Sequence, residues 1–148
     1  MRCNIVIGLV ALVTISPSFL AAAEPTQVPV GVAVVDITPD YPIRMVGYES
    51  RKTESEGIAS RLKARALAIG NYDEVAGGPA VLVAVDNCAV GSKVVEEVAA
   101  RLNKRVKLPR ERFVVCSTHT HCAPALSSGL DFIFGDPLPP DQRSRIER

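Results

Sequence analysis

The chain has 148 residues and a formal net charge of +1, from 17 basic and 16 acidic side chains. This length allows one domain and at most a small second one. The balanced charge, the lack of a basic run and the absence of tryptophan give no sign of a nucleic-acid-binding surface.

The first 23 residues have the pattern of a secretory signal peptide. Arg2 supplies the positive start, residues 5–15 form an apolar run, and Ala21-x-Ala23 is a cleavage motif before Glu24. A membrane span takes about 20 apolar residues, so this run is short for one, and an uncleaved anchor is the alternative. We therefore predict a leader over 1–23, a folded part over 24–148, and export to the periplasm or the medium.

The hydrophobic pattern predicts four strands between residues 31 and 117. The strands are expected over residues 31–37, 62–69, 80–86 and 113–117. The apolar pattern of the first strand predicts that it is buried. The third is so continuously apolar that we expect both of its faces to be covered. A turn over 70–78 would join the second and third strands in antiparallel fashion.

Residues 91–106 have the clearest helical pattern, with Val94, Val98 and Leu102 recurring every four residues. Another helix is expected to begin near Asp141. The order strand, helix, strand predicts a βαβ unit with two parallel neighbours and a right-handed crossover. The fold class is therefore α/β, with a mixed sheet.

In such sheets, ligands bind beyond the carboxyl ends of the strands. Asp86 ends one strand of the βαβ unit, and His119 and His121 follow the other. We therefore expect all three side chains along the same rim of the sheet. The alternative for Asp86 is a loop or cap residue that accepts hydrogen bonds from nearby backbone N–H groups.

His119 and His121 are the only histidines in the chain. In extended chain they would point to the same side, with their backbones about 7 Å apart. Neutral imidazole is the commonest metal ligand, so the pair predicts a metal or acid/base site, and two surface loop histidines are the alternative. A catalytic zinc takes three protein ligands, so carboxylates, a tyrosine or Cys122 would have to complete the set. Cys122 is disfavoured, because adjacent residues of a strand face opposite ways.

The three cysteines that remain after the leader, Cys88, Cys116 and Cys122, are an odd number. At least one thiol is therefore free, bound to metal or paired with another molecule.

Three other hydrolase patterns fit poorly. In the metallo-β-lactamase motif an Asp and a His would stand where this chain has Ala123 and Pro124. Barrel amidohydrolases carry their His-x-His at the end of the first strand, whereas at least two predicted strands precede it here. The Gly-x-Ser-x-Gly motif of serine hydrolases is absent from the sequence.

Several short motifs follow one another between Gly31 and Pro124, and together they are more specific than any one alone. They are Val35-Asp36-Ile37-Thr38, Met45-Val46-Gly47-Tyr48, Gly57-Ile58, Ala64-Arg65-Ala66, the strand ending in Asp86, the helix with Ala100-Arg101-Leu102, and Thr118-His119-Thr120-His121. In this order they resemble the N-terminal part of the neutral/alkaline (non-lysosomal) ceramidase family.

The resemblance implies part of a larger catalytic domain of a secreted or membrane-associated zinc amidase. Such an enzyme cleaves the N-acyl bond of ceramide, a lipid amide, and would contact membranes peripherally. By the same resemblance, His119 is a zinc ligand, whereas His121 faces the substrate and stabilises the tetrahedral oxyanion. The family's other ligands, a second His, a Glu and a Tyr, align downstream of Arg148.

The sequence departs from the family pattern in two places. Cys122-Ala123 stands where the family usually has Ser-Gly, and Ala59 stands where many members carry a histidine. The change beside His121 keeps open a hydrolase of a different amide or ester on the same scaffold. A truncated or vestigial exported binding protein without catalysis is the other alternative.

Overall fold

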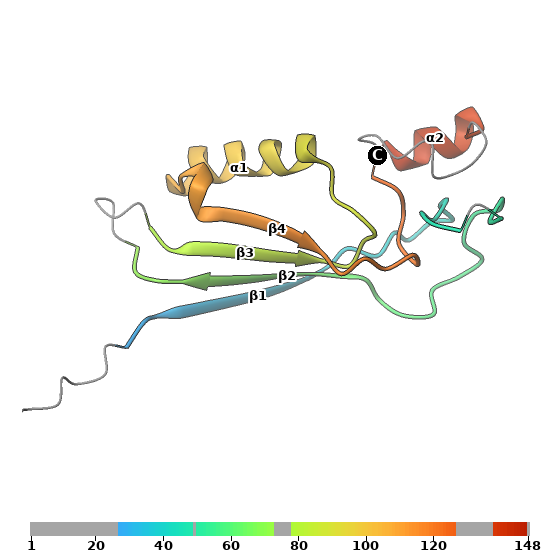
Figure 1. Ribbon diagram of the computed structural model, residues 1–148. Helices are drawn as coiled ribbons and strands as arrows, with labels where there is room; N and C mark the ends of the chain where they lie inside the picture. The colour runs from blue at the N-terminus through green and yellow to red at the C-terminus, as the bar shows by residue number, and fades with distance from the viewer. Residues whose placement is uncertain (1–26, 49, 73–77, 127–137, 148) are drawn as a thin grey trace, which may run out of the picture.

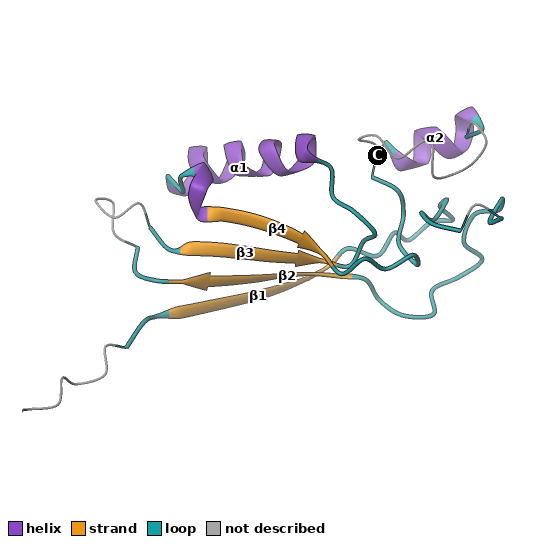
Figure 2. Ribbon diagram, in the orientation of Figure 1, coloured by secondary structure: helices purple, strands orange, loops and turns teal. Residues whose placement is uncertain are grey.

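The computed structural model describes residues 27–48, 50–72, 78–126 and 138–147. Within these residues the chain forms a mixed four-stranded sheet with one long helix beside it (Figures 1 and 2). The expected leader over 1–23 lies outside the described residues. Among the described helices, none combines the length and the apolar character needed to cross a bilayer.

The strands lie side by side in chain order. They are β1 (Val30–Asp36), β2 (Lys63–Ile69), β3 (Ala80–Val85) and β4 (Phe113–Ser117). β1 pairs with β2 and β2 with β3 in antiparallel fashion, whereas β3 and β4 run parallel. The four predicted strands, the antiparallel turn and the parallel pair are therefore confirmed, with bounds that differ by a residue.

Helix α1 (Ser92–Val106) connects β3 to β4 and packs on one face of this pair. Its buried residue is Ala99, which joins Leu108 and Phe113 in an apolar cluster. Around these three pack the half-buried side chains of Val81, Val83, Val95, Leu102 and Val115. The predicted stripe is right at Leu102, but the other inward residues are Val95 and Ala99 in place of Val94 and Val98, and Val98 is exposed.

The prediction that the first strand is buried is wrong. Every residue of β1 is exposed, and Val32 exposes 80% of its surface. β1 is the edge strand of the sheet, and the helix lies over β3 and β4 at the other side (Figure 1). β3 is likewise covered on one face only, since Leu82 is exposed. An apolar run indicates a strand, but it does not show what covers that strand.

The loops and helix α2 (Pro140–Ile146) gather beyond the carboxyl ends of β3 and β4 (Figure 1). Here a second apolar cluster brings together residues from distant parts of the chain. Its members are Val46, Cys88, Ala125 and Leu138, with Ile146 packed against them. Arg145 holds α2 to the loop before β2, because its guanidinium forms an ion pair with Glu54 at 2.7 Å. The helix expected near Asp141 is thus confirmed.

Candidate metal centre beyond β3 and β4

Three side chains of the types that can bind transition metals lie together beyond the carboxyl ends of β3 and β4. One ligand atom from each of Cys88, His119 and His121 lies within 4.8 Å of the other two. Cys88 is buried, His121 is half-buried and His119 is exposed. The backbone N–H of Thr118 donates to the carbonyl of Val85 at 3.0 Å, which extends the β3–β4 pairing to the edge of the cluster.

His119 adopts a left-handed backbone conformation with φ of 60°. The expected extended spacing of the two histidines is therefore wrong, because β4 ends at Ser117. Their rings nonetheless meet edge to face, with centroids 5.2 Å apart. The turn, rather than the two-residue period of a strand, brings them together.

The hydrogen bond of His119 determines which of its nitrogens is available to a metal. Its Nδ1 lies 2.9 Å from the backbone carbonyl of Cys88. A carbonyl oxygen can only accept, so Nδ1 carries the hydrogen and the neutral ring keeps its lone pair on Nε2. A backbone carbonyl is one of the partners by which proteins orient a metal-binding imidazole.

His121 is held by the loop that follows β1. The ring of Tyr48 meets its imidazole at a centroid distance of 5.0 Å, and Arg51 lies over the Tyr48 ring. The guanidinium of Arg51 also donates to the carbonyl of His121 at 2.7 Å. Gly47 is buried against the imidazole, because a Cβ built on it would lie 2.5 Å from His121 Nδ1. The loop therefore fixes both the backbone and the ring of His121.

Sequence reasoning did not identify these supporting residues. Gly47 and Tyr48 entered it only as part of a family motif, and Cys88 only as one of three unassigned thiols. Gly47 has φ of 82° and Tyr48 has φ of 61°, so both occupy the left-handed region that most side chains avoid. The Gly-Tyr pair, within a segment without periodicity, was the available signal for a specific turn.

Asp86 lies at the end of β3 but is not one of the three clustered residues. Its Oδ2 accepts a hydrogen bond from the backbone N–H of Lys63 at 2.9 Å, and its Oδ1 lies 3.0 Å from Arg65 Nη1. The Lys63 N–H, followed by the Arg65 guanidinium, lowers the pKa of the Asp86 carboxyl. In this position Asp86 ties the end of β3 to β2.

The substitution Asp86→Asn tests this contact through the pH dependence of stability. A carboxyl whose pKa is lowered by folding stabilises the protein above its unfolded pKa of about 3.9, and loses that effect as the pH falls through the folded pKa. We expect Asp86→Asn to lower the free energy of unfolding by about 1–2 kcal/mol at pH 7. The deficit should begin to shrink below about pH 4, where the unfolded chain takes up the proton.

Urea denaturation at pH 7 and at about pH 3 measures both differences. Asp40, whose side chain is exposed, provides the control variant Asp40→Asn. An Asp86→Asn deficit of the same size at the two pH values would contradict the assigned role of the carboxylate.

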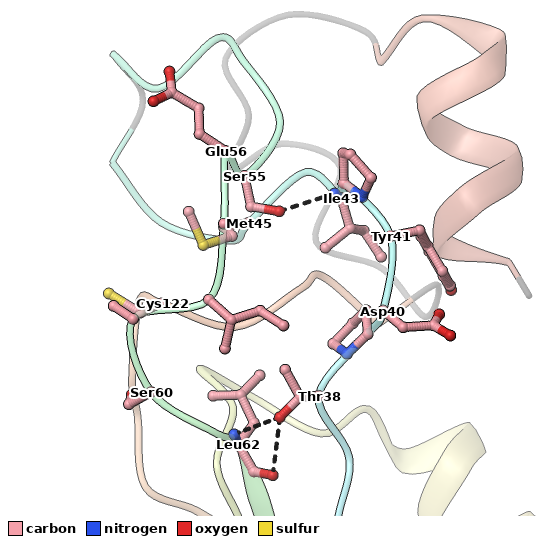
Figure 3. A pocket seen from close by; sticks show the side chains of 15 residues that line it. Thr38, Asp40, Tyr41, Ile43, Met45, Ser55, Glu56, Ser60, Leu62 and Cys122 are labelled. Carbon is pink, nitrogen blue, oxygen red and sulfur yellow. Dashed lines mark hydrogen bonds between the residues drawn. The ribbon is translucent and has the colours of Figure 1, made fainter.

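A cavity of about 310 Å³ opens next to the cluster, between residues 38–45 and residues 55–62 (Figure 3). Cys122, which directly follows His121, forms part of its wall together with Met45. The two segments are joined by hydrogen bonds, from the Ile43 N–H to Ser55 Oγ at 3.1 Å and from the Leu62 N–H to Thr38 Oγ1 at 2.8 Å. The cavity is therefore bounded by connected backbone and begins one residue from the histidines.

The donors of the cluster suit zinc better than magnesium or calcium. Imidazole nitrogen and thiolate sulfur are the ligands that zinc prefers, whereas magnesium and calcium prefer oxygen. No carboxylate of the described residues belongs to the group. The residues present therefore fit a zinc ion.

Comparisons with known proteins match this chain to a single enzyme family. Residues 29–130 match the family model for "Neutral/alkaline non-lysosomal ceramidase, N-terminal". Neutral ceramidase of Oryza sativa subsp. japonica is 35% identical over 119 residues, and neutral ceramidase of Drosophila melanogaster is 31% identical over 116 residues. These matches cover 78% and 76% of this chain.

Two solved structures share the fold. Neutral ceramidase from Pseudomonas aeruginosa superposes with a TM-score of 0.56 at 29% identity, covering 71% of this chain and 17% of that one. A ceramidase complexed with C2 gives 0.54 at 30% identity, covering 68% and 16%. The chain spans only 14% and 16% of the rice and fly relatives. Because the family model matches most of its described residues, the chain belongs to the neutral/alkaline non-lysosomal ceramidase family, as part of its N-terminal region.

Proposed function

We propose that this chain supplies part of the active site of a zinc-dependent amidase that cleaves the N-acyl bond of ceramide or a related lipid amide. The relatives are called neutral ceramidases, which supports the substrate class. The observation that carries the proposal is the pair of imidazoles beyond β4, with His119 Nε2 left available by the Cys88 carbonyl.

Each histidine has a separate task in this proposal. Zinc, when bound, is a Lewis acid that polarises a carbonyl and lowers the pKa of water. His119 holds the metal through Nε2, and the Cys88 carbonyl keeps its ring oriented. His121 donates a hydrogen bond to the oxygen of the acyl carbon as negative charge develops there. A positioned donor of this kind contributes about 3 kcal/mol to transition-state stabilisation.

The surroundings of His121 suit that task. Its ring is fixed by Tyr48 and by the close approach of Gly47, so little reorganisation is needed when the substrate arrives. The cavity beside Cys122 offers room for part of a lipid next to the reacting carbonyl. A lipid substrate would bring the protein to a membrane surface, and we propose an exported, periplasmic or secreted location for it.

Hydrolysis by the purified intact protein tests the function. We expect it to release fatty acid from ceramide, to lose at least about 90% of that activity on removal of zinc by a chelator, and to recover on addition of zinc. A fatty-acid ester and an N-acyl amino acid of the same chain length serve as comparison substrates. Preferential cleavage of either one, or full activity without metal, would contradict the proposal.

A further inference from the structure

We propose that Ala59 and Cys122 determine which acyl chains the protein accepts, because both line the cavity that receives the acyl group of the substrate. This inference rests on the proposed amide hydrolysis and names the part of the substrate that the cavity binds. The cavity volume of about 310 Å³ is at the lower end of the range for small-molecule sites, about 300–1,000 Å³. It therefore has room for part of an alkyl chain.

The loop that carries His121 also forms the near wall of the cavity. Cys122 is the next residue and lines the cavity together with Met45. The N–H of Val46, which follows Met45, donates to the carbonyl of Ala123 at 2.9 Å. This bond joins the two segments of the wall directly beside the histidine. A substrate carbonyl that meets His121 therefore has the cavity next to its substituents.

The wall of the cavity suits an alkyl chain better than a polar group. The hydroxyl groups of Thr38 and Ser55 already accept hydrogen bonds from backbone N–H groups (Figure 3). The hydroxyl of Tyr41 donates to the carbonyl of Arg145 at 3.3 Å. In ceramide, the sphingoid base carries hydroxyl groups close to the nitrogen, whereas a plain acyl chain carries none. The acyl chain is therefore the better match. Apolar members of the wall are Pro39, Pro42, Ile43, Met45, Ile58 and Leu62.

Two carboxylates, those of Asp40 and Glu56, also belong to the wall, and both residues are exposed. Exposure lets them keep their hydration, so they place no charge in a dry site. Their negative charge disfavours a free fatty-acid anion but not a neutral amide. The wall therefore distinguishes the amide substrate from the acid that its hydrolysis releases.

Ala59 and Cys122 are also positions where the sequence departs from the family pattern. Ala59 stands in place of a histidine, and Cys122 in place of a serine. A covered imidazole or serine hydroxyl needs a hydrogen-bond partner, whereas a methyl group needs none and a thiol behaves as a small apolar group. Both departures make the wall more apolar, and the one at Ala59 leaves more room. Neutral change at exposed positions is the competing explanation, and it predicts no effect on chain-length preference.

Hydrolysis of sphingosine amides with acetyl and octanoyl chains tests the inference on the intact protein. Each methylene group moved from water into an apolar site is worth about fourfold in binding. We expect kcat/KM to be at least about tenfold higher for the octanoyl amide than for the acetyl amide. Ala59→His should lower the octanoyl value at least about tenfold and the acetyl value less than about twofold, and Cys122→Ser should lower the octanoyl value about threefold. Ala100→His, at an exposed position of α1, is the matched control and should change neither value.

Protection of Cys122 from alkylation tests binding without catalysis. The probe is octanamide, a neutral amide with the same chain, and acetamide is the control ligand. Saturating octanamide should slow the reaction of Cys122 with iodoacetamide at least about threefold, because it covers the cavity wall. Acetamide should have no effect. Cys116 is exposed on β4 and does not line the cavity, so its rate should stay unchanged. Mass spectrometry of the alkylated peptides measures both rates.

Equal kcat/KM values for the acetyl and octanoyl amides would overturn the inference. A rate that follows the length of the sphingoid base instead, or an equal loss on both substrates in Ala59→His, would also overturn it. The wild-type comparison and the protection of Cys122 decide the matter even if Ala59→His fails to fold. Protection of Cys122 without hydrolysis of any amide would refute the proposed function and support the cavity as a site for apolar chains.

Discussion

Replacement of His119 by asparagine is expected to abolish hydrolysis by the intact protein, with a loss of more than about a thousandfold. The reason is that His119 presents Nε2 to the proposed zinc, whose bound chemistry is worth several kcal/mol of transition-state stabilisation. Asparagine is chosen because, like histidine, it tolerates the left-handed backbone found at this position, and it is a poor zinc ligand. Zinc content, measured by mass spectrometry, should fall in parallel with activity.

Lys107→Asn is the matched control for this experiment. Lys107 also has a left-handed backbone, with φ of 55°, but it lies at the end of α1 and outside the metal-binding cluster. We expect this variant to keep wild-type zinc and activity. Wild-type zinc content in His119→Asn would show that other residues hold the metal.

Gly47→Ala should reduce hydrolysis about a hundredfold while leaving zinc bound. The added methyl group would lie 2.5 Å from His121 Nδ1 and 2.6 Å from its Cγ, so the ring must move. A misplacement of about 1 Å in a catalytic group is enough for a loss of that size. His119 is not among the close contacts of the methyl group, which is why metal content should survive. Steady-state kinetics should show the loss in kcat.

Gly78→Ala separates this steric effect from backbone strain. Gly78 has φ of 77°, close to the 82° of Gly47, but a methyl group there meets nothing closer than 3.9 Å. Both variants should lose about 1–2 kcal/mol of stability, because an alanine at positive φ is strained. Activity should fall only in Gly47→Ala. An equal loss in both variants would point to general destabilisation.

The sequence predicted the secondary structure because the relevant signals are local. Continuous apolar runs identified β3 and β4, and the recurrence of apolar residues every four positions identified the helical segment. What covers each face is a property of the whole fold, so local signals could not predict the exposure of β1 or the inward position of Ala99 on α1.

For the candidate site, too, local features could be predicted from the sequence and tertiary contacts could not. The two histidines could be identified from their spacing, and the carboxyl ends of the parallel pair predicted where they would lie. Their contacts could not be predicted, because Cys88 and Tyr48 come from segments without periodicity and reach the histidines only through tertiary structure. Asp86 lies where the sequence placed it, yet its carboxylate faces Lys63 and Arg65 on β2.

The separation in sequence between the partners at the site also bears on how the chain folds. Cys88 and His119 are 31 residues apart, and Arg51 reaches His121 across 70 residues. Closing loops of this length costs entropy before any contact is gained, so such contacts form late, after helices and local turns. We therefore expect the site to be among the last features to assemble, and a partly folded chain to show helical circular dichroism before it can bind a metal.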